Sequence, residues 1–435
     1  MAIVFVLIAL LVVAVLVTGN WYVWRRLFRD TTKGPGAVRR AGAVVIAGGW
    51  ALAVGALVAE RGGAPFRLQQ VLAWPGFLWL ALALYLLLAV LAGELVRPVL
   101  RRILERRAGT AEAAPAPARP EPIPAGRGAG RGPSGATGGE TDGDDAAADD
   151  GATGPQEAPA APSRRLFVSR VVGGAAAAAA VGTVGYGTYG VLRGPQVKRV
   201  TVPLARLPRA AHGYRIAVVS DIHLGPVLGR GFAQKVVDTI NSTQPDLIAV
   251  VGDLVDGSVK DLGPAAAPLA QLRARHGSFF VTGNHEYFSG AEQWVEEVRR
   301  LGLNPLENAR TELPHFDLAG VNDVAGEDEG QGPDYAKALG DRDRARACVL
   351  LAHQPVQIHD AVDHGVDLQL SGHTHGGQLF PGNLVAGLAN PTLAGLDRYG
   401  DTQLYVSRGA GAWGPPTRVG APSDITVIEL ASKQA

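Results

Sequence analysis

The chain has 435 residues, which is long enough for two or three domains. Hydrophobic residues make up 47% of the chain and charged residues only 19%, a composition that is apolar for a purely soluble protein and indicates a membrane component. The net charge is +1, and no Lys/Arg block is interleaved with aromatic residues in the C-terminal half, so nucleic acid is not expected as a partner.

Three uncharged stretches lie in the first hundred residues, at positions 1–24, 41–59 and 68–93. Each is long enough to cross a bilayer, because about 20 helical residues span the ~30 Å hydrocarbon core. We therefore predict a transmembrane region with three helices within residues 1–107. A cleaved signal peptide is the alternative for the first stretch, but no basic residue precedes its apolar run.

The distribution of positive charge predicts the orientation of these helices. The segment "RRLFRDTTKGPGAVRR" between the first two spans is strongly basic, whereas the next loop carries only Arg61 and Arg67. Basic loops stay in the cytoplasm, so the first of these segments and the arginines that follow the third span should lie inside. Residues 108–162 consist mainly of Ala, Pro, Gly and Asp, and we expect a disordered linker, since too few large apolar groups are present to offset the entropy of ordering.

The next segment, residues 163–193, opens with Ser163, Arg164, Arg165 and Phe167 and continues as an uncharged Ala/Gly-rich stretch over residues 171–192. It resembles a twin-arginine export signal, although such a signal normally begins a chain and three spans precede it here. The alternative is a fourth transmembrane helix with basic residues on its cytoplasmic flank. Both interpretations place the rest of the chain on the extracytoplasmic side, and the sequence leaves open whether the segment is cleaved.

From about Val200 to the C-terminus, short β-branched runs alternate with amphipathic helical stretches, which predicts an α/β domain over residues 200–435. The expected helices at 231–241 and 291–302 each place large apolar side chains on one face. The expected buried strands are "YRIAVVSD", "DLIAVVGD", "SFFVTGNH", "VLLAHQ" and "DLQLSGHTH". Polar residues follow each strand, and in open α/β sheets sites form where the carboxyl ends of strands converge.

These strand ends carry oxygen and imidazole groups but no thiolate, since Cys348 is the only cysteine. In "SDIHLG", Asp221 and His223 would face one side of an extended segment. Such ligands suit Mn, Fe, Zn or similar divalent ions, and two ions about 3.5–4 Å apart would use all of them. The candidate residues are Asp221, His223, Asp253, Asn284, His285, His353, His373 and His375.

The ordered series D-x-H, G-D, G-N-H-E, an upstream H and G-H-T-H resembles the calcineurin-like metallophosphoesterases over residues 204–430. The stretches "GHTHGGQ" and "YVSRGAGAWGPPTRVGAPSDITVIEL" are similar to the membrane-anchored bacterial branch of that family. The resemblance implies a two-sheet β-sandwich flanked by helices, preceded here by the α-helical transmembrane region. It also implies a dimetal site at one edge of the sandwich.

The resemblance further implies a role for each site residue. Asp221, His223 and His375 would bind one metal ion. Asn284, His353 and His373 would bind the other, and Asp253 would bridge the two. His285 would be catalytic and point at the substrate. The residues implied to line the substrate cleft are Asn284, Gly376, Gly377 and Gln378.

The predicted function is that of a membrane-tethered dimetal phosphoesterase acting on phosphodiester or pyrophosphate bonds, with lipid or cell-envelope compounds as candidate substrates. A metal-bridging hydroxide would attack the phosphorus, and protonated His285 would donate to the leaving oxygen. The alternative is a membrane sensor or scaffold whose phosphoesterase-like domain only binds a ligand. A decayed site should have lost a ligand or His285, and none is missing. A nuclease of the same superfamily fits the metals but not the membrane region or the near-neutral charge.

Overall fold

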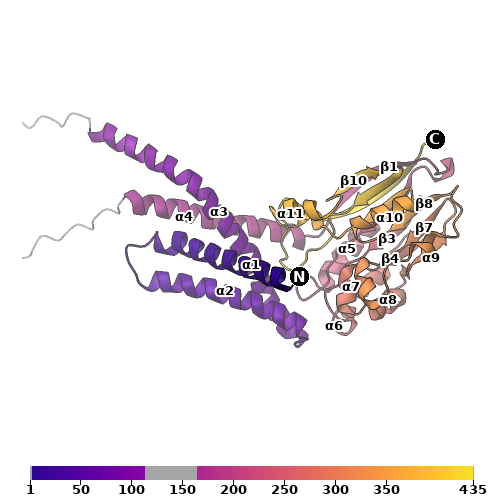
Figure 1. The fold of residues 1–435 in the computed structure, drawn as a ribbon, viewed down its shortest axis with the longest axis horizontal. Helices are drawn as coiled ribbons and strands as arrows, with labels where there is room; N and C mark the ends of the chain where they lie inside the picture. Colours follow the sequence, from indigo (N-terminus) through magenta and orange to yellow (C-terminus); the bar gives the residue numbers. More distant parts are fainter. Residues whose placement is uncertain (1, 113–163, 435) are drawn as a thin grey trace, which may run out of the picture.

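The computed structural model describes residues 2–112 and 164–434 of the chain. Within these residues, long helices form one end of the molecule, and two β-sheets with shorter helices form the other (Figure 1). The long helices are α1 (Ala2–Trp24), α2 (Ala37–Arg61), α3 (Phe66–Glu112) and α4 (Arg164–Leu192), and a π-helical turn, η1 (Arg25–Arg29), follows α1.

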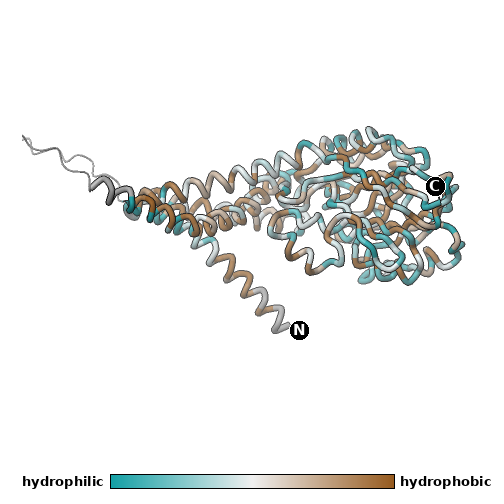
Figure 2. The backbone as a smooth tube through the Cα atoms, turned by 90° about the horizontal axis from the view of Figure 1, so that it is seen from above, coloured by the Kyte–Doolittle hydropathy of each residue, from teal (hydrophilic) through white to brown (hydrophobic). Residues whose placement is uncertain are grey.

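Among the described residues, three helices are long and apolar enough to cross a membrane: Ala37–Arg61, Phe66–Arg106 and Arg164–Leu192. They contain the spans expected at 41–59 and 68–93 and the apolar segment at 171–192. Figure 2 shows hydrophobic residues along these helices and a mixed pattern in the sheet domain. The first expected span falls in α1, where several side chains lie outside the described residues. The linker was expected at residues 108–162; α3 extends into this range and ends at Glu112, and residues 113–162 lie outside the described part of the chain.

The α2 and α3 helices approach each other closely because small residues lie between them. A Cβ atom on Gly76 of α3 would lie only 2.6 Å from the backbone oxygen of Leu52 in α2, so no larger residue fits there. Membrane helices commonly associate in this way, since lipid tails provide no hydrophobic drive between helices. At the end far from the sheets, Arg26 of η1 forms an ion pair of 2.8 Å with Glu94 of α3. These contacts make one bundle of α2, α3 and η1.

The sheet domain contains two six-stranded sheets. The strands are β1 (Gln196–Leu204), β2 (Tyr214–Val219), β3 (Leu247–Val251), β4 (Ser278–Val281), β5 (Asn304–Pro305), β6 (Ala309–Glu312), β7 (Phe316–Gly320), β8 (Ala347–Leu351), β9 (Leu368–Ser371), β10 (Gly395–Tyr399), β11 (Thr402–Val406) and β12 (Asp424–Ser432). The first sheet has the order β1-β12-β2-β3-β4-β5, and the second has the order β10-β11-β9-β8-β7-β6. In the first sheet β12–β2 is the antiparallel pair and the other neighbours are parallel. In the second sheet a parallel core lies between the antiparallel pairs β10–β11 and β6–β7.

Shorter helices connect the strands. The α-helices are α5 (Arg230–Ser242), α6 (Val259–Ala266), α7 (Asn284–Ser289), α8 (Ala291–Arg300), α9 (Tyr335–Leu339), α10 (Ile358–Asp363) and α11 (Gly382–Ala389). The 3₁₀ turns are η2 (Arg209–Ala211), η3 (Ala267–Gln271), η4 (Val324–Glu329), η5 (Pro355–Gln357) and η6 (His375–Gly377).

The two sheets pack face to face, and helices cover their outer faces. Along β2, Ile216 and Val218 belong to the core between the sheets, whereas Ala217 and Val219 face the core that includes α5 and α8. This alternation follows from the period of two in a strand, and burial of both faces explains why β2 has no polar side chain in its last four positions. The predicted two-sheet sandwich flanked by helices is therefore confirmed.

The expected amphipathic helices are also present, as α5 and α8. In α5 the side chains of Phe232, Val236, Val237 and Ile240 are buried. In α8 Trp294 is fully buried against the same sheet. Because these helices cover one face of the first sheet, the loops at its carboxyl edge remain available for a site.

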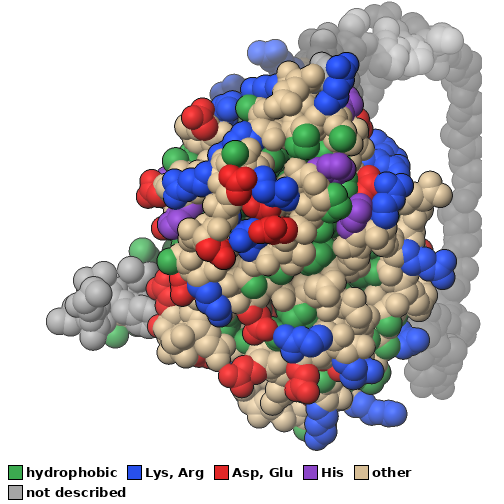
Figure 3. All heavy atoms as spheres, turned by 90° about the vertical axis from the view of Figure 1, so that its right-hand side faces the viewer, with side chains coloured by type: hydrophobic (Ala, Val, Ile, Leu, Met, Phe, Trp, Pro, Cys, Tyr) green, Lys and Arg blue, Asp and Glu red, His purple; other side chains and the backbone are tan. Residues whose placement is uncertain are grey.

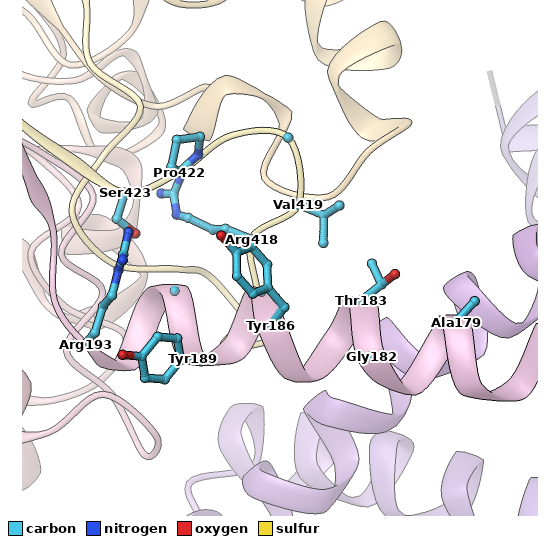
Figure 4. A pocket seen from close by; sticks show the side chains of 13 residues that line it. Ala179, Gly182, Thr183, Tyr186, Tyr189, Arg193, Arg418, Val419, Pro422 and Ser423 are labelled. Atoms are coloured by element: carbon cyan, nitrogen blue, oxygen red, sulfur yellow. The ribbon is translucent and has the colours of Figure 1, made fainter.

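The long helices contact the loops that follow strands β9 and β11 of the second sheet. The Tyr85 hydroxyl in α3 donates a hydrogen bond of 2.9 Å to the backbone oxygen of Phe380. In α4, a Cβ atom on Gly187 would lie 2.6 Å from the backbone oxygen of Arg418, and the hydroxyls of Thr188 and Thr417 are 2.8 Å apart. Figure 4 shows the loop that carries Arg418 and Val419 passing directly over α4. The membrane helices and the sheet domain are thus joined through these loops.

Candidate metal centre

The predicted ligands lie where the chain turns sharply after a strand. Asp221 and His223 follow β2, Asp253 follows β3, and His373 and His375 follow β9. All five have a positive φ, between 49° and 71°, which is uncommon for residues other than glycine and concentrates at functional sites. The backbone at Asp221 and His223 is therefore not extended, contrary to the geometry assumed from the sequence. The side chains nevertheless converge, because each turn redirects one residue toward the same edge.

The first cluster consists of Asp221, His223 and His375, whose ligand atoms all lie within 4.8 Å of one another. The Nε2 atoms of His223 and His375 are 3.0 Å apart, and His375 Nε2 is 3.4 Å from Asp221 Oδ1. All three residues are buried. Two imidazole nitrogens and a carboxylate oxygen thus converge on one point, as ligands of a metal ion do.

The second cluster consists of Asp253, His353 and His373, again within 4.8 Å. His353 Nε2 lies 3.1 Å from Asp253 Oδ2, and His373 Nδ1 lies 3.0 Å from the side-chain oxygen of Asn284. Asn284 is the first residue of α7, which places its amide beside this cluster. The structure therefore brings together the same residues that were predicted to hold the second ion.

Asp253 lies between the clusters. Its Oδ2 atom is 3.1 Å from His353 Nε2 in the second cluster and 3.8 Å from His223 Nε2 in the first. Its Oδ1 atom accepts a hydrogen bond of 2.9 Å from the backbone N–H of His285. Among the site carboxylates, Asp253 thus reaches histidines of both clusters, which is the position that a bridging ligand requires.

The chemistry of these residues fits a pair of divalent ions. The Nδ1 atom of His353 lies 2.8 Å from the backbone oxygen of Val251 and donates to it, so Nε2 is the nitrogen that can face a metal ion. That Nε2 atom is buried and has no hydrogen-bond partner with acceptable geometry. A buried nitrogen of this kind is costly unless another group, such as a metal ion, accepts its lone pair.

The local charges act in opposite directions on the site histidines. Burial lowers the pKa of His353 and of His223, but Asp253 beside His353 and Asp256 beside His223 outweigh burial and raise both pKa values. Burial, His223 and Arg418 hold the pKa of His375 well below its usual range, and burial with His353 lowers the pKa of His373 to about 4. These last two imidazoles are therefore neutral. Burial alone would raise the pKa of Asp253, but His353 and His223 hold it well below the ordinary value, so this carboxyl is ionised. Burial raises the pKa of Asp221 as well. Metal binding needs neutral imidazoles and ionised carboxylates, so a bound ion would replace the protons that these groups hold.

Glu286 fixes the shape of the loops that carry the ligands. Its fully buried carboxylate accepts hydrogen bonds from the backbone N–H groups of Asp253, Leu254 and Gly283, at 2.9, 2.8 and 2.6 Å. These bonds tie the turn after β3 to the start of α7. The sequence pattern G-N-H-E contained this residue, but only the structure shows that it holds the backbone of a ligand rather than a metal.

Asp256 was not predicted from the sequence. Its Oδ1 atom lies 2.8 Å from His223 Nδ1 and 2.7 Å from His285 Nδ1, so one carboxylate orients a cluster histidine and the predicted catalytic histidine. Asp256 precedes Gly257 in "GDLVDG", and at that position an aspartate is equally typical of a turn. Its proximity to the ligand Asp253 is the signal that could have indicated a role.

Asp256 and His285 stabilise each other's charged forms. Burial lowers the pKa of His285, but the hydrogen bond to Asp256 and the charges of Asp256 and Asp253 outweigh it and raise the pKa to about 9. In turn, burial raises the pKa of Asp256, but His223 and His285 bring it down to about 2. His285 is therefore protonated at neutral pH and can donate a proton. The side chains of Phe288 and Trp413 flank its ring, with centroids 5.5 and 5.6 Å away.

Arg418 is a second residue that the sequence did not single out. Its buried guanidinium donates to the backbone oxygen of His375 at 3.0 Å and lies 3.2 Å from His375 Nδ1. A further bond of 2.6 Å to the backbone oxygen of Gly411 holds the guanidinium in place. Arg418 therefore fixes the orientation of His375. Because it lies 43 positions away in the chain, no local motif links the two residues.

The predicted cleft residues after His375 form a tight turn. Gly376 and Gly377 have φ values of 61° and 83°, and they lie outside the two clusters. The amide of Gln378 donates to the backbone oxygens of Trp413 and Pro415, and its oxygen accepts from the Trp413 N–H. Gln378 thus holds the loop at 413–415 beside His285.

A family model described as calcineurin-like phosphoesterase matches residues 214–377, which include every residue of both clusters. A transmembrane protein with metallophosphoesterase domain from Danio rerio is 39% identical over 264 residues, covering 58% of this chain and 60% of that protein. A metallophosphoesterase of Helicobacter pylori strain J99 is 39% identical over 250 residues, covering 57% of this chain and 67% of its own length. A metallophosphoesterase from Aquifex aeolicus is 34% identical over 243 residues, which cover 55% of this chain and 92% of that protein.

The two-sheet fold carries paired His/Asp clusters that could hold metal ions. With these relatives, the chain belongs to the calcineurin-like metallophosphoesterase family. Its predicted membrane helices accompany this domain, and the chain spans less than two thirds of the Danio rerio protein.

Proposed function

We propose that the protein is a membrane-tethered phosphoesterase that hydrolyses phosphodiester or pyrophosphate bonds with two divalent metal ions. The observation that carries this proposal is the pair of complete clusters with Asp253 between them. Asp221, His223 and His375 would hold one ion. Asn284, His353 and His373 would hold the other, and Asp253 would contact both. When bound, the two ions would activate water and stabilise the charge on the phosphoryl oxygens.

His285 supplies the proton that the leaving oxygen needs. It is held by Asp256 through a contact of 2.7 Å and is protonated at neutral pH, which is the state of a general acid. Its backbone N–H bonds to Asp253, so the imidazole stays next to the metal centre. Asp256 is a positioning residue in this scheme, since it fixes the ring of His285 and stabilises its charge.

The placement that we propose for the domain is extracytoplasmic. The ends of α2 and α4 and the start of α3 adjoin the sheet domain, whereas η1 and the basic end of α3 lie at the opposite end of the bundle (Figure 1). Since basic segments remain in the cytoplasm, this arrangement supports the orientation expected from charge. The face of the domain remote from the helices carries interspersed acidic and basic side chains, which suits a surface in water (Figure 3).

We further propose that α4 is retained as a membrane anchor rather than removed as an export signal. Ala180 and Val184 of α4 pack in one cluster with Tyr85 of α3, and Val191 is fully buried in the core of the sheet domain. Loss of α4 would expose these apolar surfaces. The helix therefore supports the fold as well as the attachment to the membrane.

The hydrolytic function is tested with the full chain purified in detergent. The purified protein would be incubated with Mn²⁺ and with phosphodiesters, nucleotide sugars, lipid phosphates and phosphomonoesters. We expect hydrolysis of a diester or a pyrophosphate that a chelator abolishes and added metal restores. Full metal loading without hydrolysis of any class would instead support the sensor or scaffold.

A further inference from the structure

A cavity connects the metal centre with the membrane helices. It has a volume of about 320 Å³, and its walls include both the site residues His223 and Asp256 and residues of α2 and α3. The helices contribute Leu57 from α2 and Phe77 and Leu80 from α3. These residues lie within the segments Ala37–Arg61 and Phe66–Arg106, which are apolar enough to cross a membrane. We refer to this cavity as the α2–α3 pocket.

The two ends of the α2–α3 pocket differ in chemistry. At one end His223 and Asp256 belong to the metal centre. At the other, the wall is hydrocarbon, and Val227 of the sheet domain packs against Phe77 between the helices. Trp413 lies on the domain side of the same cavity, next to His285. A ligand that fills this space must therefore be polar at the metals and apolar along the helices.

Charged groups of α2 also line the α2–α3 pocket. Glu60 and Arg61 both line the pocket and follow Leu57 by three and four positions, so they share one face of α2 with it. The Glu60 carboxylate interacts electrostatically with Asp256 and His285. The charged end of a membrane span therefore lines the same cavity as Asp256 and interacts with His285.

We propose that the α2–α3 pocket holds the hydrocarbon chain of a membrane lipid whose phosphodiester or pyrophosphate group is hydrolysed at the metal centre. This inference rests on the proposed hydrolytic function and assigns its substrate class. Water provides the oxygen of the new P–O bond, the P–O bond to the leaving oxygen breaks, and His285 protonates that oxygen. The lipid enters from the bilayer because the helical wall of the pocket belongs to the spans.

A second hollow does not serve this purpose. It lies along α4, has a volume of about 640 Å³, and is lined by Tyr186, Tyr189 and Arg193 among others (Figure 4). None of the residues that line it belongs to the two clusters. It meets the metal centre only through Arg418, which lines it and bonds to His375, whereas the α2–α3 pocket includes the predicted ligand His223 itself.

The test compares esters that differ only in chain length. Full-length protein in detergent with Mn²⁺ would be assayed on one phosphodiester head group carrying an alkyl chain of two or of sixteen carbons. We expect kcat/KM to be higher for the long chain, because added methylenes gain apolar contact. Equal values for both chains would overturn the lipid assignment but leave the hydrolase intact, whereas no hydrolysis of either ester would contradict the proposed function itself.

Substitutions inside the pocket identify the binding site. We expect Leu57→Trp and Leu80→Trp to lower the ratio of long-chain to short-chain kcat/KM about tenfold, since the added volume competes with the alkyl chain. The matched control is Val58→Trp, on the same helix at an exposed position, which should leave this ratio unchanged. If neither pocket variant changes the ratio, or if Val58→Trp lowers it equally, the chain binds elsewhere and the inference is wrong.

Discussion

Replacement of His285 by alanine separates metal binding from proton transfer. His285 contacts Asp256 at 2.7 Å, and together with His223 these residues form a third group that could hold a metal ion. If His285 is instead the general acid, His285→Ala should keep both metal ions and lose about 10²–10⁴-fold in kcat. This corresponds to roughly 2.7–5.4 kcal/mol of transition-state stabilisation.

The loss should depend on the leaving group. An aryl ester with a leaving group of low pKa departs without a proton, whereas an alkyl ester needs one, so the alkyl ester should suffer much more. Metal content would be measured on the same samples. Phe288→Ala is the matched control, because Phe288 is on the same helix, lies 5.5 Å from the His285 ring and is exposed. It should retain the activity and the leaving-group dependence of the original protein.

Two outcomes would refute this reasoning. Loss of one metal ion along with activity would make His285 a ligand. Equal losses on the aryl and the alkyl ester, with both ions retained, would make it an anchor for the phosphate group, and the general acid would have to be another residue.

Three further predictions concern the bridge, its support and the topology. Asp253→Asn should cost more activity than any other single ligand change. Elemental analysis should find one metal ion or none per chain of this variant. Two tightly bound ions with near-normal turnover would exclude the bridging role. Glu286→Gln should lower the free energy of unfolding by about 1–3 kcal/mol and lower the Tm, because the new amide N–H would face backbone N–H donors. The control Glu296→Gln, on the exposed face of α8, should leave the Tm unchanged. A reporter active only in the cytoplasm should be silent after Ala435 and active within residues 108–162, and the reverse pattern would overturn the orientation.

The sequence alone determined the parts of this protein that depend on local pattern. Uncharged runs of sufficient length predicted the apolar stretches of α2, α3 and α4. Short β-branched runs predicted the strands, and the rule that strand ends converge predicted that Asp253, His353 and His373 would lie together. These predictions succeed because the length of an apolar run and the end of a strand can both be recognised from residues that are neighbours in the chain.

The tertiary structure decided which of these residues touch and what supports them. Asp221 and His223 converge through left-handed turns rather than through an extended segment, and the sequence does not encode that geometry in a recognisable motif. Asp256 was indistinguishable from a turn residue until the fold placed it against His223 and His285. The α2–α3 pocket joins Leu57 to Asp256, about two hundred positions apart in the chain. Contacts of this kind depend on packing between separate elements, so they exist only once the membrane helices and the sheet domain have come together.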